Sequence, residues 1–226
     1  MKIPPQWASL PHGFRCVAWA LSLTSLTLAG GCEALKPAVS SHPNLYTLSN
    51  APGTAIPARP EARASVTAPT LIVSPPHAAA GFDSKRIIYI RRAEQLEYFA
   101  QNEWIDTPAR MLAPLIVSAI ESSGAFRAVV QTPSTAAGEM RLDIEILRLQ
   151  HEFLSAPSQV RFTLRAYLVE NKTRRVIASR EFDAAVSAAS EDPHGGVMAA
   201  NRAVKSVLED LSAFCAAAAR STPVDK

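Results

Sequence analysis

The part of this sequence best suited to a chemical reaction is a run of small side chains that ends in a thiol, Leu28-Ala29-Gly30-Gly31-Cys32. A protease that cuts after small side chains needs such residues to fit its binding pocket, and a cysteine at the next position offers a sulfur atom that can be acylated. The predicted chemistry is therefore cleavage between Gly31 and Cys32 and attachment of lipid to Cys32.

The segment before this run has the composition of an export signal. Lys2 and Arg15 provide positive charge, and residues 16–29 form an apolar stretch of 14 residues. A helix that spans a bilayer needs roughly 20 residues, whereas the apolar centre of a signal peptide is shorter. Residues 1–31 are thus predicted to be removed. The alternative is an ordinary secretory signal that precedes an unmodified cysteine.

The cleavage site resembles the lipobox of bacterial lipoproteins, with Ala29 at the position where Leu is commoner. The resemblance implies that Cys32 carries acyl chains such as palmitate. Glu33 follows the cysteine, where the best-known signal for retention in the inner membrane has Asp. We therefore expect a lipid-anchored protein on the periplasmic face of the outer membrane, with the inner membrane as the alternative.

Charge and cysteine content limit which binding partners the protein is expected to have and how its fold is stabilised. Loss of Lys2 and Arg15 leaves 21 of the 23 basic residues against 20 acidic ones, so the mature chain is close to neutral and no nucleic-acid partner is expected. An acylated Cys32 would leave Cys215 without a partner in the mature chain, and the fold must then be stable without disulfides. Cys215 falls on the apolar side of a helical pattern and is expected to be a core residue.

The sequence contains no motif that predicts an enzyme. It has no G-x-S-x-G, no H-E-x-x-H and no glycine-rich phosphate loop. His42, His77, His151 and His194 are scattered and lack the spacing of metal ligands. The pair Asp192-Pro193 reads as the start of a helix rather than as a catalytic acid. We expect no catalytic residue, no cofactor and no metal site.

Hydropathy patterns indicate one α+β domain at residues 70–220, after a lipidated Pro/Ala-rich tether (32–69) and before a short tail (221–226). A short strand is expected near 44–48 within the tether. Period-two alternation predicts three long antiparallel strands between 140 and 185. Helical spacing predicts helices at 108–123 and 194–219, the first with a kink or a late start at Pro114. The expected fold is a mostly antiparallel sheet with two main helices packed on one face.

Aromatic residues gather just before the first of these helices. Alternation along a strand should bury one of Tyr98 and Phe99 and expose the other, and Trp104 is expected in the loop before the helix. Packing in the core explains these side chains most simply. The alternative is an edge that binds a partner or contacts lipid, and Tyr98, Phe99 and Trp104 are then the candidate partner-binding residues.

Residues 44–215 as a whole resemble the ABC-type transport auxiliary lipoprotein family, which includes the PqiC-type lipoproteins. Tyr46 and Leu48 match the family's first strand after the lipidated cysteine. The later positions match in order: Tyr89, Leu96, Tyr98, Trp104, Pro108, Leu112 and Phe126. The sequence departs from the family pattern at Ala29 and in an enlarged Pro/Ala-rich loop at 49–68.

The resemblance implies a non-catalytic auxiliary component of an MCE/ABC-type system that moves lipids between membranes. It implies an MCE-domain protein and an ABC permease/ATPase complex as partners, and a ring of identical copies is a further expectation. The competing hypothesis is a structural or assembly lipoprotein of the outer membrane that is unrelated to ABC transport. A lipid carrier would need a large apolar cavity, whereas a scaffold would have a filled core.

Overall fold

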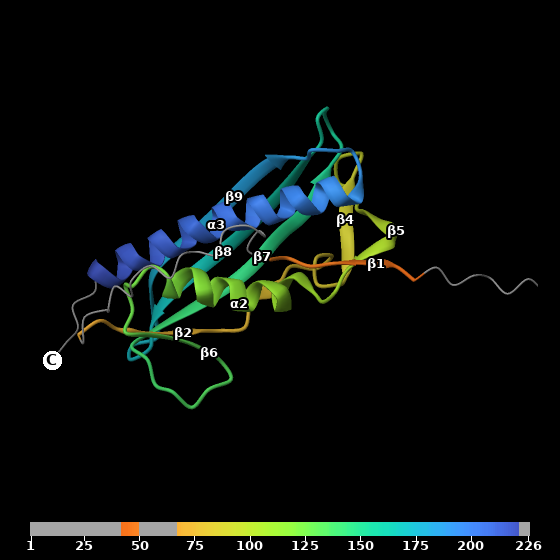
Figure 1. Ribbon diagram of the computed structural model, residues 1–226. Coiled ribbons are helices and arrows are strands. Elements are labelled where there is room, and N and C mark those ends of the chain that lie inside the picture. The colour runs from red at the N-terminus through yellow and green to blue at the C-terminus, as the bar shows by residue number, and fades with distance from the viewer. Residues whose placement is uncertain (1–41, 50–66, 222–226) are drawn as a thin grey trace, which may run out of the picture. The chain divides into compact units, whose positions relative to one another are not determined.

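One of the two longest strands, residues Met140–Glu152, lies inside the sheet and pairs with other strands along both of its edges. The computed structural model describes residues 42–49 and 67–221 (Figure 1), so the signal segment, Cys32 and most of the tether lie outside the described part. In chain order, the elements are β1 (Asn44–Tyr46), β2 (Thr70–Val73), β3 (His77–Ala78), β4 (Arg86–Ile90), β5 (Glu97–Trp104), α2 (Pro108–Glu121), β6 (Ala128–Gln131), β7 (Met140–Glu152), β8 (Gln159–Glu170), β9 (Arg175–Ser187) and α3 (Pro193–Ser221).

The three long strands β7, β8 and β9 form the antiparallel meander that the alternation predicts. Along β7, Leu142, Ile144 and Ile146 are buried, and the residues between them are partly exposed. Successive side chains of a strand point to opposite faces, so one face of the meander supplies the core and the other meets solvent. The predicted antiparallel arrangement of residues 140–185 is confirmed.

The other edge of β7 is covered by three short strands in succession. β2, β3 and β4 each pair in parallel with a different part of β7. β6 extends the sheet beyond β2 in parallel, whereas β5 pairs antiparallel with β4 and β1 pairs in parallel with β5. The α+β class is confirmed, but the sheet is mixed. Parallel neighbours need a long crossover, and between the parallel neighbours β2 and β6 the chain supplies one that includes α2.

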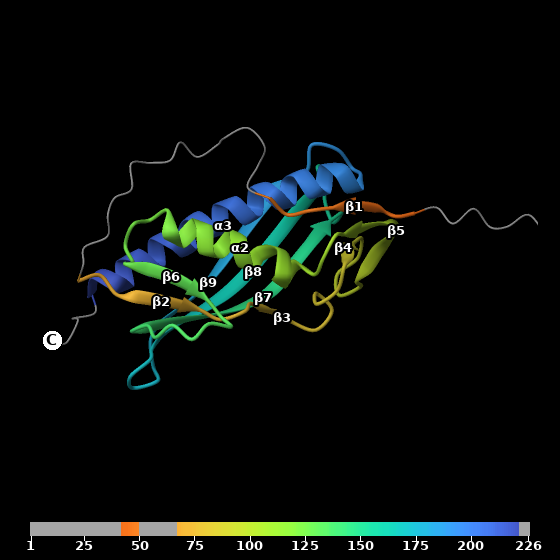
Figure 2. The same ribbon diagram turned by 60° about the horizontal axis from the view of Figure 1, so that its bottom comes forward.

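Both helices pack on the same face of the sheet, as predicted (Figure 1, Figure 2). The Ser212 hydroxyl on α3 donates to the Ala119 carbonyl on α2 at 2.8 Å, which ties the two helices together. α2 begins at Pro108, so the expected late start does not occur. Pro114 is exposed within the helix, so the carbonyl that its missing N–H leaves free can reach water.

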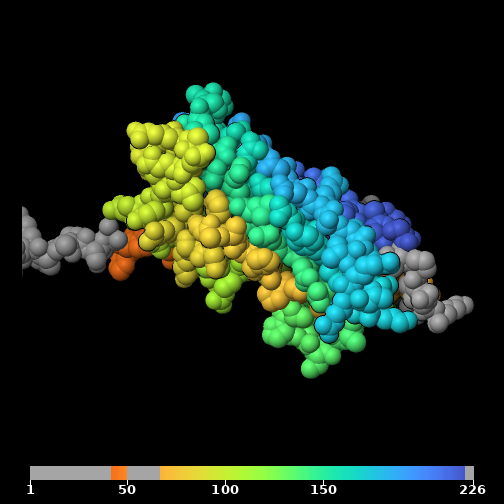
Figure 3. Space-filling view, turned by 180° about the vertical axis from the view of Figure 1, so that it is seen from behind, coloured from red at the N-terminus to blue at the C-terminus, as the bar shows by residue number. Residues whose placement is uncertain are grey.

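The face of the meander opposite the helices carries a row of ion pairs and is visible from behind in Figure 3. Arg165 lies between Glu145 (3.7 Å) and Glu181 (2.9 Å). Arg161 makes similar pairs with Glu152 and Asp183. Exposed ion pairs contribute only about 0–1 kcal/mol each, so this face is stabilised weakly by its charges, and the opposite, apolar face stabilises the fold.

Shortening a side chain in the middle of the apolar face tests whether that face, and not the charged face, stabilises the fold. Leu142→Ala should lower the free energy of unfolding by about 2–5 kcal/mol, because it removes buried methyl groups and leaves a cavity. Val176→Ala is the matched control, because Val176 is 52 % exposed and its replacement should cost within ~0.5 kcal/mol. Urea unfolding followed by circular dichroism measures both. Equal losses in the two variants would contradict the described core.

Candidate functional site

Four aromatic rings gather where β4, β5 and the end of β7 meet. Tyr89 lies 4.5 Å from Phe99 and 5.9 Å from Phe153, measured between ring centroids. Phe153 lies 4.1 Å from His151. Register explains the grouping, because Tyr89 pairs with Glu97 on β5 and with His151 on β7. The cluster thus connects the β4–β5 hairpin to the central strand.

A hydrogen-bonded carboxylate stabilises the outer side of this cluster. Glu97 accepts hydrogen bonds from the Tyr89 hydroxyl at 3.1 Å and from the Arg91 guanidinium. The bond from Arg91 is the main reason that the pKa of Glu97 lies below its usual value. Burial, followed by the hydrogen bond to Glu97, raises the pKa of Tyr89. These three side chains are positioned by one another and serve the hairpin's structure.

The three aromatic candidates from the sequence occupy different environments. Tyr98 is 50 % exposed, whereas Phe99 is half-buried and packs against the core, so the predicted alternation is confirmed. The expectation that Trp104 lies in the loop before the helix is wrong, because it ends β5; at 3 % exposed it packs in the core, the simplest explanation of these aromatics, and is not an exposed partner-binding residue. Its backbone N–H donates to the Lys85 carbonyl at 2.7 Å, which extends the strand to this residue. Of the three, only Tyr98 offers an accessible ring.

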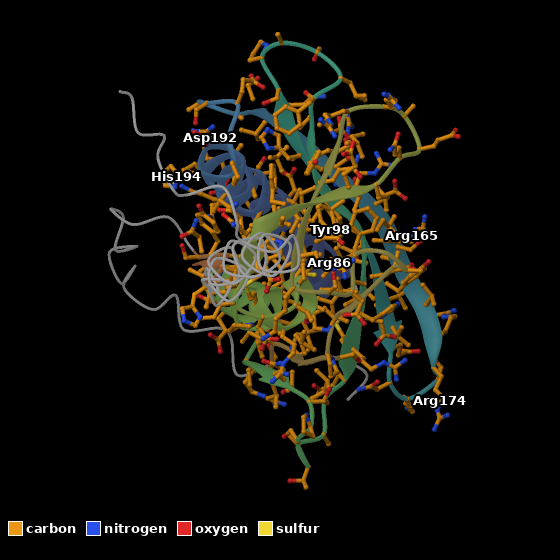
Figure 4. The ribbon with its side chains drawn as sticks, turned by 90° about the vertical axis from the view of Figure 1, so that its right-hand side faces the viewer. Arg86, Tyr98, Arg165, Arg174, Asp192 and His194 are labelled. Atoms are coloured by element: carbon orange, nitrogen blue, oxygen red, sulfur yellow. The ribbon has the colours of Figure 1, made fainter. Side chains whose placement is uncertain are left out.

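Tyr98 borders an open cleft of about 420 Å³ between the chain before β4 and the start of β5. The guanidinium of Arg86 lies 4.0 Å above the Tyr98 ring (Figure 4). Ile88 and Leu96 add apolar surface to the cleft, and Asp83 and Ser84 add polar atoms. Cation–π stacking holds the ring and the guanidinium side by side. Sequence patterns missed Arg86, because it meets Tyr98 only through the pairing of β4 and β5.

A buried histidine and serine form the arrangement closest to catalytic chemistry. His151 Nε2 lies 2.8 Å from the Ser158 hydroxyl, and the two residues are 2 % and 0 % exposed. Glu191 accepts a hydrogen bond from the Ser158 backbone N–H at 2.8 Å. Sequence reasoning treated His151 as an isolated residue. The only available signal was that His151 and Ser158 flank one turn between two long strands.

The geometry of this pair excludes it as an activated nucleophile. A catalytic serine must reach its substrate, and its histidine needs a third group on the other ring nitrogen. His151 Nδ1 has no hydrogen-bond partner among the described residues, and it faces Gly196, where an added Cβ would lie only 2.5 Å away. Burial lowers the pKa of His151, although Glu191 and Asp192 act in the opposite direction. The pair joins the β7–β8 turn to the start of α3.

Two other reactive residues in the described part of the chain have structural surroundings. Cys215 is free and buried, and burial raises the pKa of its thiol to about 12, so its predicted place in the core is confirmed. Asp192 accepts a hydrogen bond from the Gly195 backbone N–H at 2.7 Å at the start of α3, as a helix cap does. No group of three or more metal-binding side chains occurs among residues 42–49 and 67–221. The lipidation candidate Cys32 lies outside these ranges.

The family assignment follows from a match that covers most of this domain. Residues 46–212 match the model of the family described as the ABC-type transport auxiliary lipoprotein component. The chain belongs to this family. The expected resemblance is thereby confirmed from the last residue of β1 through most of α3, a range that includes nearly all of the sheet and its helical cover.

Solved structures share the fold of this auxiliary lipoprotein. Protein XCC0632 from Xanthomonas campestris, described as a DUF330 protein, matches with a TM-score of 0.66 and 24 % identity, over 78 % of this chain and 97 % of that one. The hypothetical protein CT253 from Chlamydia trachomatis matches with a TM-score of 0.50 and 10 % identity, over 68 % of this chain and 98 % of that one. No curated protein shows significant similarity to the chain.

Membership gives the auxiliary lipoprotein a coarse role and location. It is an auxiliary component of ABC-type transport, held at a membrane in the periplasm as a lipoprotein. Within the described part of the chain, no helix combines the length and hydropathy that crossing a bilayer requires.

The buried histidine predicts an acid-sensitive fold. Its pKa in the folded state lies below the ordinary 6.5, so the unfolded chain binds the proton more tightly. The stability that neutral His151 contributes is present above about pH 6.5 and is lost as the pH falls through the folded-state pKa. Urea unfolding between pH 8 and pH 5 should therefore show a steeper loss in the wild type than in His151→Gln. Identical pH profiles would show that His151 is not the responsible group.

Proposed function

We propose that this protein is acylated at Cys32 and anchors its α+β domain to the periplasmic face of the outer membrane, as a non-catalytic auxiliary component of an MCE/ABC-type lipid transport system. The observation that carries the proposal is the order of two features along one chain. A cleavage and acylation sequence ends at Cys32, and the family match begins at residue 46. Only residues 33–45 of the tether therefore separate the proposed anchor from the start of the family match.

The cavity described beneath α3 is too small for lipid, which supports a scaffold rather than a carrier of lipid. Beneath α3, the cavity beside His151, Trp104 and Val197 has a volume of only about 10 Å³. That is space for about one water molecule, whereas an acyl chain needs a cavity many times larger. The larger cleft at Tyr98 is open and half polar. Lipid would then be moved by the partners, and this protein would act by binding them.

The proposal requires partner proteins that hydrolyse ATP and bind the lipid. The chain has no phosphate-binding loop, so ATP hydrolysis falls to the separate ATPase of an ABC complex. An MCE-domain protein would bind the lipid, and a ring of identical auxiliary chains could surround it, because head-to-tail contacts close into a ring when their rotation permits.

Replacing the acylated cysteine tests the anchor. Several acyl chains at ~0.8 kcal/mol per buried CH₂ make membrane attachment effectively permanent. Cys32→Ala should therefore accumulate as an uncut precursor or a soluble periplasmic form, which fractionation and mass spectrometry distinguish. Glu33→Asp serves as the matched variant for location and should move acylated protein to the inner-membrane fraction. A Cys32→Ala protein with unchanged mass and membrane fractionation would refute the anchor.

Copurification tests the transport role. Acylated wild-type protein, extracted in mild detergent, should retain an MCE-domain protein and an ABC permease/ATPase from the same cells. An unrelated outer-membrane lipoprotein prepared identically is the control. Recovery of machinery for outer-membrane protein or lipopolysaccharide insertion in place of these partners would favour the structural or assembly role and overturn the transport role.

A further inference from the structure

Exposed apolar side chains are concentrated at one end of the described domain. Its exposed large apolar residues are Leu45, Leu96, Tyr98, Ile105, Leu154, Val176 and Met198. The first four belong to β1, β5 or the residues next to β5, and they are 47–59 % exposed. Single exposed apolar residues are ordinary on a protein surface, but a cluster marks a contact.

Strand register makes these residues one continuous surface. Leu45 pairs with Glu103 on β5, and Glu103 pairs with Arg86 on β4, so the three side chains form a row on one face. Arg86 in turn stacks on Tyr98, and Tyr98 shares its cleft with Leu96. Ile105 follows β5 directly, and its N–H donates to the Tyr46 carbonyl at 2.7 Å. We call Leu45, Arg86, Leu96, Tyr98 and Ile105 the tether-side surface.

The chemistry of the tether-side surface is that of a membrane interface. Tyrosine rings and long arginine side chains place an apolar body beneath a polar tip, as interfacial residues do. Positive and negative charges near the tether-side surface are equal in number. Arg91 is paired with Glu97. The other charged residues there are three basic ones, Lys85, Arg86 and Arg92, and three acidic ones, Asp83, Glu94 and Glu103. Contact with lipid would therefore depend on apolar burial and little on anionic headgroups.

The tether brings this end of the domain to the bilayer. Eleven residues separate Cys32 from Asn44, and that length of chain spans at most ~40 Å. Asn44 begins β1 and is fixed to β5, because its amide donates to Asn102 at 3.2 Å. The β8–β9 turn lies at the opposite end of the long strands (Figure 2), and a strand of 13 residues is ~43 Å long.

We propose that the tether-side surface rests against the bilayer that holds Cys32 and thereby fixes the orientation of the domain on the membrane. The inference depends on acylation of Cys32, which belongs to the proposed function. The covalent anchor raises the local concentration of bilayer surface, so a few side chains suffice for a contact that they could not maintain from free solution. A protein partner could bind a surface of similar composition. The position of the tether favours the bilayer.

Site-specific fluorescence quenching tests the orientation. Leu96→Cys in the full-length acylated protein provides one accessible thiol, because Cys32 is acylated and Cys215 is buried with a raised pKa. The thiol is labelled with an environment-sensitive dye, and the protein is reconstituted in phosphatidylethanolamine vesicles that contain a lipid with a nitroxide at the headgroup level. Val176→Cys, on an equally exposed apolar residue at the far end, is the matched control. Ile105→Cys is a second probe if Leu96→Cys fails to fold by circular dichroism.

A side chain held ~5–10 Å into the headgroup boundary contacts the nitroxide, so the label at position 96 should lose about half or more of its fluorescence. The label at position 176 should keep its fluorescence, and added salt should change neither result. Equal quenching at both positions, or none at either, would overturn the orientation. So would protection of position 96 that appears only when purified MCE-domain protein is added. Mass spectrometry of the same sample verifies acylation, so failure of the anchor is distinguished from failure of this surface.

Discussion

The hydrogen bonds along both edges of β7 are the constraint on which the rest of the domain depends. β8 satisfies one edge over its full length, and β9, which is as long as β7, pairs with the far edge of β8 and leaves the second edge of β7 to shorter strands. β2, β3 and β4 share that edge, and each is too short to be stable alone. Because β4 pairs with the last residues of β7, the β4–β5 hairpin and β1 are carried to one end of the sheet. The tether-side surface exists because of that sequence of pairings.

The same strand separates the domain into two chemically different faces. Side chains such as Leu142 and Ile146 lie under the helices, and the small residues of α3, Ala199 and Ala203 among them, let its backbone approach the sheet closely. The opposite face carries paired charges around Arg165 (Figure 4). His151 sits on the helical side, where Gly196 leaves room for its ring. A histidine so enclosed stabilises the joint between sheet and helix and is unable to reach a substrate.

Sequence patterns predict the parts of this fold that depend on neighbours along the chain. The alternation in β7, β8 and β9 and the periodicity of both helices are local signals, and they locate those elements well. The parallel pairing of the short strands is decided by which edge of β7 remains open, and no local pattern contains that information. Trp104 was misplaced for the same kind of reason. β5 continues to Trp104 because this residue pairs with Tyr46 on β1 and donates a hydrogen bond to the Lys85 carbonyl, and both partners are distant in the sequence.

The features of the candidate site fall into the same two groups: those that local sequence patterns predict and those that depend on strand pairing. Exposure of Tyr98 beside half-buried Phe99 follows from alternation, and the proposed acylation of Cys32 follows from a linear motif. The stacking of Arg86 on Tyr98 and the row from Leu45 to Arg86 require register across three strands.

A single lipid anchor holds a domain near a membrane but leaves it free to rotate. A second, non-covalent contact next to the anchor would remove that freedom, and weak apolar contacts are sufficient there because the tether has already met most of the entropic cost of association. The open, charged face of the meander would then keep a fixed direction relative to the membrane, as the proposed role of binding partner proteins would require.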